Sequence, residues 1–220
     1  MTALQRQGTA LADDARGTQG SAPRASVQEI IDAAATTEAF AVTLLGVALD
    51  NAAKGTLALD AEQQQALRAA RAAEQAHYDC LLGMGAKPTT TAFTLPDPRI
   101  VADVPIFLRA LIDLEESSVA AYIAAAQAFA ILGEARLAQV ALQIGAIEAE
   151  HRVAGRLYAI DAGILSGTPN DVAFEKALYS RVDQAEAMLR RSGFIDGAGG
   201  RIDYPGPGAI DNTGVSELVP

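Results

Sequence analysis

Apolar residues recur at helical spacing in four long stretches of the chain. The first runs from residue 26 to about 50, and the second from residue 60 to about 83. The third begins near residue 105, and the fourth follows Gly133 and reaches about residue 161. In each stretch, apolar side chains three or four residues apart would form one stripe along a helix. Since no segment shows the alternating pattern of a strand, the pattern predicts an all-α fold built on four long helices.

The signals at the ends of these stretches predict how the helices are connected. Ser26 with Glu29 is typical of a capping box, and Asp60 is a suitable N-cap for the second helix. The turn before Asp60 is short, whereas residues 86–103 contain three prolines and are too many for a tight turn. We therefore expect a four-helix bundle at 26–163, with residues 86–103 crossing its length between the second and third helices.

The remaining segments are predicted to be accessory. Apolar residues at helical spacing indicate a fifth helix at 171–191, which contains no ligand-type residue in its stripe and is expected to serve packing or association. The segment 193–220 is rich in Gly, Pro and Asp, so we expect an extended or disordered tail that drapes over a neighbour. Residues 1–25 are expected to be disordered.

Composition narrows the classes of partner. The net charge of −10, without basic patches, argues against nucleic acid and anionic membranes. Residues 1–24 show no continuous apolar run of a secretory signal, and no apolar stretch of membrane-spanning length free of charges or polar breaks is evident. With a single cysteine, Cys80, no internal disulfide is possible. These features predict a soluble cytoplasmic protein, and an Ala-rich bundle with an extra apolar helix favours a homodimer.

The two histidines of the chain carry its most specific signal. Each follows a glutamate by three residues, in Glu74-Gln-Ala-His77 and Glu148-Ala-Glu-His151. The chance of this coincidence is on the order of 0.003 for this composition. Because positions i and i+3 lie on one helix face, each pair can aim a carboxylate and an imidazole at the same point.

Two further glutamates lie on apolar stripes, Glu38 in the first helix and Glu115 in the third. Four buried carboxylates would be costly to desolvate, but two divalent cations would cancel their charge. Oxygen and imidazole donors without thiolate suit iron first, then manganese or a mixed iron–manganese pair, and zinc after them. The expected metal ligands are Glu38, Glu74, His77, Glu115, Glu148 and His151.

The order of these motifs and the long connection after the second helix resemble the ferritin-like superfamily over residues 26–161. Glu115-Glu-Ser-Ser-Val-Ala-Ala-Tyr122 and Ile147-Glu-Ala-Glu-His151 are similar to the third and fourth helices of its ferritin-like-domain group, which includes desiccation-related and stress proteins. The resemblance implies a dimetal carboxylate site with Glu74 and Glu148 as bridging ligands. It makes the histidines terminal ligands and Glu38 and Glu115 terminal or bridging, and which glutamates bridge stays open.

Several residues near the expected ligands could have more than one role. Glu116 and Glu150 are rival ligands, although helix geometry places them off the stripes. Cys80 has no basic neighbour and is expected to be a small buried residue. Tyr122 and Tyr158 are expected either to pack in the core or to hydrogen-bond to the ligands.

The expected function is that of a di-iron or manganese protein that reacts with O₂ or peroxide, as an oxidase, ferroxidase or peroxide-detoxifying enzyme. No CxxC pair is present to supply electrons, which disfavours a rubrerythrin-type peroxidase. A non-catalytic metal-binding or stress-protective bundle is the alternative, and a purely structural helical module is the third possibility.

Overall fold

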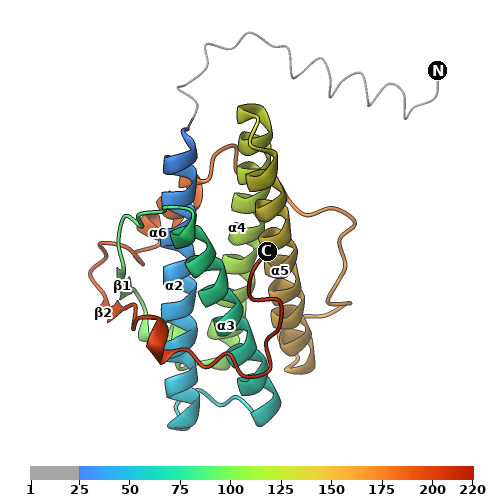
Figure 1. Cartoon of the computed structure of the whole chain (residues 1–220). Coiled ribbons are helices and arrows are strands. Elements are labelled where there is room, and N and C mark those ends of the chain that lie inside the picture. The colour runs from blue at the N-terminus through green and yellow to red at the C-terminus, as the bar shows by residue number, and fades with distance from the viewer. Residues whose placement is uncertain (1–24) are drawn as a thin grey trace, which may run out of the picture.

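Four long helices form the body of the protein. The computed structural model describes residues 25–220, in which the helices are α2 (Val27–Ala53), α3 (Ala61–Gly83), α4 (Val104–Leu132) and α5 (Ala135–Asp161) (Figure 1). The smaller elements are β1 (Ala92–Leu95), η1 (Pro98–Val101), α6 (Asp183–Arg191), β2 (Gly200–Asp203) and η2 (Pro207–Ala209). The predicted all-α class is confirmed, and the disorder expected at the start of the chain falls almost entirely on residues outside the described part.

The residues that cap the long helices help to explain how these helices are connected. Ser26 and Asp60 each form a complete capping box, with Glu29 and Gln63 respectively. Gly133 adopts the left-handed conformation after α4, which lets α5 turn back directly. The segment between α3 and α4 runs the length of the bundle instead, so that α4 starts beside the end of α2 (Figure 1). The crossover is therefore present as expected.

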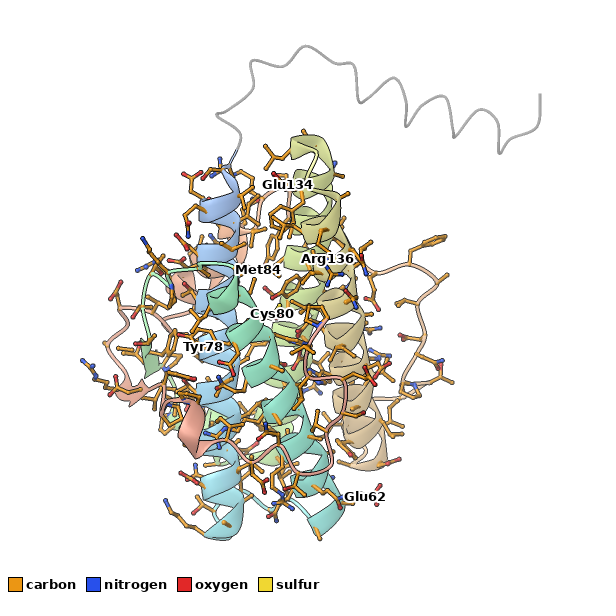
Figure 2. The ribbon with its side chains drawn as sticks, in the orientation of Figure 1. Glu62, Tyr78, Cys80, Met84, Glu134 and Arg136 are labelled. Atoms are coloured by element: carbon orange, nitrogen blue, oxygen red, sulfur yellow. The ribbon has the colours of Figure 1, made fainter. Side chains whose placement is uncertain are left out.

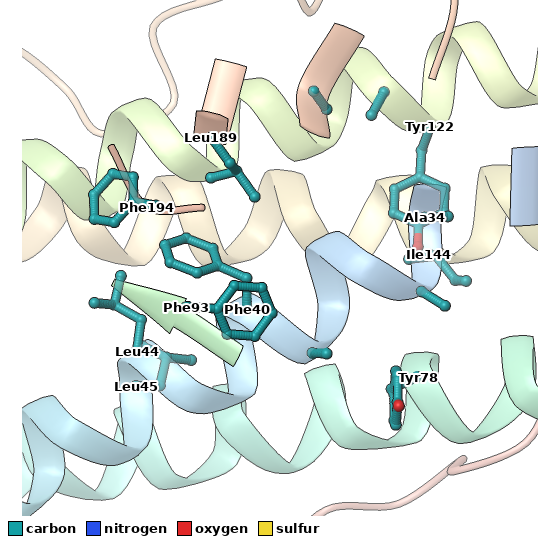
Figure 3. Packing of buried hydrophobic residues seen from close by; sticks show 14 of the residues in the cluster. Ala34, Phe40, Leu44, Leu45, Tyr78, Phe93, Tyr122, Ile144, Leu189 and Phe194 are labelled. Carbon is teal, nitrogen blue, oxygen red and sulfur yellow. The ribbon is translucent and has the colours of Figure 1, made fainter. Parts of the chain in front are cut away.

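A two-stranded antiparallel sheet joins this crossover to the far end of the chain. β1 pairs with β2, with Phe93 opposite Ile202. Alternate β1 residues face inward, and the Phe93 ring packs edge-on to Phe40 of α2 with centroids 5.4 Å apart (Figure 3). Phe194 lies on the other side of Phe40, at 4.9 Å. The expectation of no strand was wrong here because four-residue strands are too short to produce an alternating pattern and are held by this long-range packing.

The predicted fifth helix is wrong over most of its length. Only Asp183–Arg191 is helical, whereas residues 171–182 run irregularly beside α4 and α5. Phe174 and Leu178 remain 89% and 50% exposed, so they bury little surface. A short helix depends on burying one apolar face, and the first half of this segment has nothing to cover it. Val182 and Leu189 do reach the core, and there the helix forms.

Helix α2 is long and apolar enough, by length and composition alone, to span a membrane. The sequence predicts no such stretch free of charges or polar breaks, and Glu38 lies within this helix. Its polar residues do not interrupt it, since Glu38 points into the bundle. Of its most apolar window, 78% is buried within the protein, which is typical of a core helix.

Candidate metal centre

The six predicted ligands converge at the middle of the bundle. Two overlapping groups of side chains each have ligand atoms within 4.8 Å of one another. One group is Glu38, Glu74, His77 and Glu148, and the other is Glu74, Glu115, Glu148 and His151. Every one of the four long helices contributes, because each residue lies on the apolar stripe of its helix.

The two groups share Glu74 and Glu148. Each of the other four residues belongs to one group, so that each group has one imidazole and one carboxylate of its own. This is the distribution that two neighbouring cations need, with Glu74 and Glu148 between them. The arrangement favours these two glutamates as bridging residues, the question that the sequence left open.

Burial isolates these donors from water. The four carboxylate side chains are only 1–6% exposed, and the side chains of His77 and His151 are 11% and 13% exposed. The Nδ1 atom of His77 is 3.1 Å from Glu148 Oε1 and 3.5 Å from both Glu38 Oε2 and Glu74 Oε2. The Nδ1 atom of His151 is 2.8 Å from Glu74 Oε1. Both imidazoles thus turn Nδ1 toward the carboxylates.

Most of these inward-facing atoms lack a hydrogen bond despite the short distances. Both carboxylate oxygens of Glu74, Oε1 of Glu148 and the Nδ1 atoms of both histidines are buried without a hydrogen-bond partner. The contacts are close but misdirected for an N–H donor, which indicates that the lone pairs converge on common points. Buried polar atoms are rarely left in this way. The buried Glu and His donors could therefore hold metal between the helices.

The crowding of charges shifts the pKa values of the metal-free site. Burial, with the nearby charges of Glu148 and Glu74, raises the pKa of Glu38 well above its ordinary value, and the pKa of Glu115 is raised for the same reasons. Burial alone would raise the pKa of Glu74, but the two histidines outweigh it and hold that pKa low. Burial likewise opposes the charged histidines, but the surrounding carboxylates raise their pKa values.

These shifts predict that the metal-free protein loses stability as the pH rises from about 5 to about 9. The raised pKa values of His77 and His151 contribute stability below their unfolded pKa of about 6.5, and this is lost as the pH passes the folded pKa. The raised pKa values of Glu38 and Glu115 likewise contribute stability at low pH, and this contribution is lost as the pH rises above about 4.5. Glu74, with its lowered pKa, contributes above about 4.5 and stays constant in this window.

Denaturation in chelator across this range checks the prediction. Bound divalent metal should reverse the trend, because its ligands must be deprotonated. Metal-free protein that became more stable toward pH 9 would contradict it.

Two further buried residues lie on the helices that carry the ligands. Tyr122 is buried and donates a hydrogen bond to Glu38. Of the two roles expected for Tyr122, this is the hydrogen bond to a ligand. Arg152 was not anticipated from the sequence. It is buried directly after His151 and donates to Glu175 at 2.8 Å, while its Nε has no partner. Its only sequence signal is an arginine adjacent to a ligand-type histidine on a mostly apolar helix.

The rival residues lie elsewhere. Glu116 forms an ion pair with Lys176 at 2.6 Å on the surface, and Glu150 is exposed. Cys80 is half-buried, not fully buried as expected, because it lines a cavity beside His77. Tyr158 is also half-buried and lines the neighbouring cavity next to His151.

Comparison with known proteins finds no match for this chain. No protein-family model matches the chain, and neither a curated protein nor a solved structure matches it. The burial and geometry of the donors therefore carry the functional conclusion.

Proposed function

We propose that the protein is a dimetal carboxylate protein that binds iron, or manganese, and reacts with O₂ or peroxide. The single observation that carries this proposal is the set of unpartnered, buried donor atoms that converge from four helices. The ligand types support iron or manganese, because oxygen and imidazole donors surround the site and Cys80 belongs to neither group.

The residues of the chain perform three tasks in this proposal. Glu38, Glu74, Glu115 and Glu148 supply four negative charges that balance two divalent cations. Both histidines provide neutral nitrogen donors at opposite ends of the site. A bound metal pair supplies the electrons that reduction of dioxygen or peroxide requires.

Tyr122 acts through Glu38. Its hydroxyl group holds that carboxylate in place, and burial keeps the phenol protonated, because the pKa of Tyr122 is raised well above its ordinary value by burial and by the Glu38 charge. The carboxylate thus keeps one oxygen occupied by the phenol and one free for a cation.

The wider proposal includes membership of the ferritin-like superfamily, a stress-related role in the cytoplasm and association as a homodimer. The order of the ligands along α2, α3, α4 and α5, together with the lengthwise crossover, supports the superfamily assignment.

The test is iron oxidation. Protein loaded with Fe(II) without oxygen and then exposed to O₂ or hydrogen peroxide should oxidise the iron at least about tenfold faster than free Fe(II) in the same buffer, because buried carboxylates favour Fe(III). Loss of Fe(II), followed with a ferrous chelator dye, measures it. Full iron loading without acceleration by either oxidant would reject the catalytic role and leave the non-catalytic metal-binding protein.

A further inference from the structure

Helices α3 and α5 leave a groove between them. α3 packs on α2 and α5 packs on α4, while α3 and α5 barely contact each other. Two cavities of about 440 and 560 Å³ lie between these helices. They have lining residues in common, namely Ala73, Ile147, Val215 and Ser216, so they form adjoining halves of one groove. Its size is that of a small-molecule site.

Small apolar residues form the walls of this groove. On α3 they recur every three or four residues as Ala66, Ala69, Ala70, Ala73 and Ala76, over about 15 Å of helix. On α5 the walls include Ile147, Ala154 and Gly155. The charged lining residues among those described are the acidic Glu115, Glu150 and Glu217, with no Lys or Arg to balance an anionic ligand. The groove therefore suits a slender molecule without negative charge.

The groove reaches the candidate metal centre through its histidines. His77 lines one half, and His151 with Glu115 lines the other. These imidazoles are more exposed than the glutamates of the site, yet each is about nine-tenths buried and has an unpartnered Nδ1. A ligand in the groove would lie directly against both imidazoles.

The segment 214–220 covers the groove. Figure 1 shows it crossing in front of α3 and α5, and Arg136 donates a hydrogen bond to the Pro220 carbonyl at 3.1 Å. Only Val215 and Leu218 of this segment are half-buried, and the rest is exposed. Figure 2 labels Arg136 on α5 and Cys80 on α3, near the two sides of this cover. So lightly packed a segment can move aside at little cost.

We propose that this groove binds a neutral, slender apolar molecule beside the two histidines, with residues 214–220 closing over it. Its role as a substrate of the metal centre rests on the proposed function, whereas binding itself does not. The lining chemistry and the opening of the groove onto both histidines carry the inference together.

The experiment uses metal-free, full-length protein and the neutral fluorescent probe N-phenyl-1-naphthylamine. The probe should bind at about one site per chain and be displaced by 1-decanol, with decanoate at least about tenfold weaker because no cation lines the groove. Ala73→Phe fills the wall shared by both halves and should weaken binding at least about tenfold. Ala61→Phe, the same change at an exposed position of α3 outside the groove, should leave it unchanged.

A second readout needs no variant. Cys80 lines the half of the groove next to His77, so saturating 1-decanol should slow its alkylation by N-ethylmaleimide at least about fivefold. Absence of probe binding, equal binding by Ala73→Phe, or unchanged alkylation would each overturn the groove site, and equal displacement by decanoate would overturn the neutral class. Metal content measured without probe tests the metal centre separately, so the two proposals can fail independently.

Discussion

Glu148→Gln is expected to reduce metal binding from about two divalent ions per chain to one or none. Glu148 belongs to both ligand groups, so one substitution removes a donor from each cation and leaves three negative charges against four positive ones. Wild-type protein should gain about 5–10 °C in melting temperature at a free metal concentration about 100 times Kd, and the variant should lose most of this gain. Elemental analysis after dialysis and thermal denaturation measure both effects.

Glu150→Gln is the matched control. It removes the same charge from the same helix, but its side chain is exposed and belongs to neither ligand group, so metal content should stay at the wild-type value. Without metal, Glu148→Gln keeps nearly the size and shape of the buried side chain, so circular dichroism should show that the variant still folds. Equal metal loss in both variants, or none in either, would contradict the placement of Glu148.

Phe93→Ala is expected to lower the free energy of unfolding by about 3–5 kcal/mol. Phe93 is only 1% exposed and packs against Phe40, so truncation leaves a cavity where the crossover meets α2. Chemical denaturation of both proteins gives the difference.

Phe174→Ala removes the same group from a side chain that is 89% exposed, so its cost should stay within about 0.5 kcal/mol. If both substitutions cost the same, the crossover strand would not be part of the core.

The long helices could be predicted because their signals are local. Ser26 and Asp60 carry their capping partners three residues ahead, and Gly133 supplies the left-handed turn that ends α4. The crossover could be predicted as well, since a long proline-containing segment cannot close a tight antiparallel turn.

The accessory region could not be predicted in the same way. Residues 171–182 have helical spacing, but side chains there bind α4 and α5 one by one, as in the pairs Arg156–Asp171 and Ser117–Tyr179. β1 and β2 are more than a hundred residues apart and are fixed by contacts such as Thr94 Oγ1 to the Gly193 carbonyl. The spacing of apolar residues shows that a helix would have a face to bury. Whether that face is buried depends on the tertiary packing of the other elements.

For the candidate site, the sequence by itself determined the donors. Glu-x-x-His at both histidines fixes a carboxylate and an imidazole on one helix face, whatever the rest of the fold does. Only the tertiary structure decided that Glu74 and Glu148 lie between the two histidines, because this depends on the register of one helix against another. It also decided that α3 and α5 stay apart, since each packs against a different neighbour, and this leaves the groove that reaches the imidazoles.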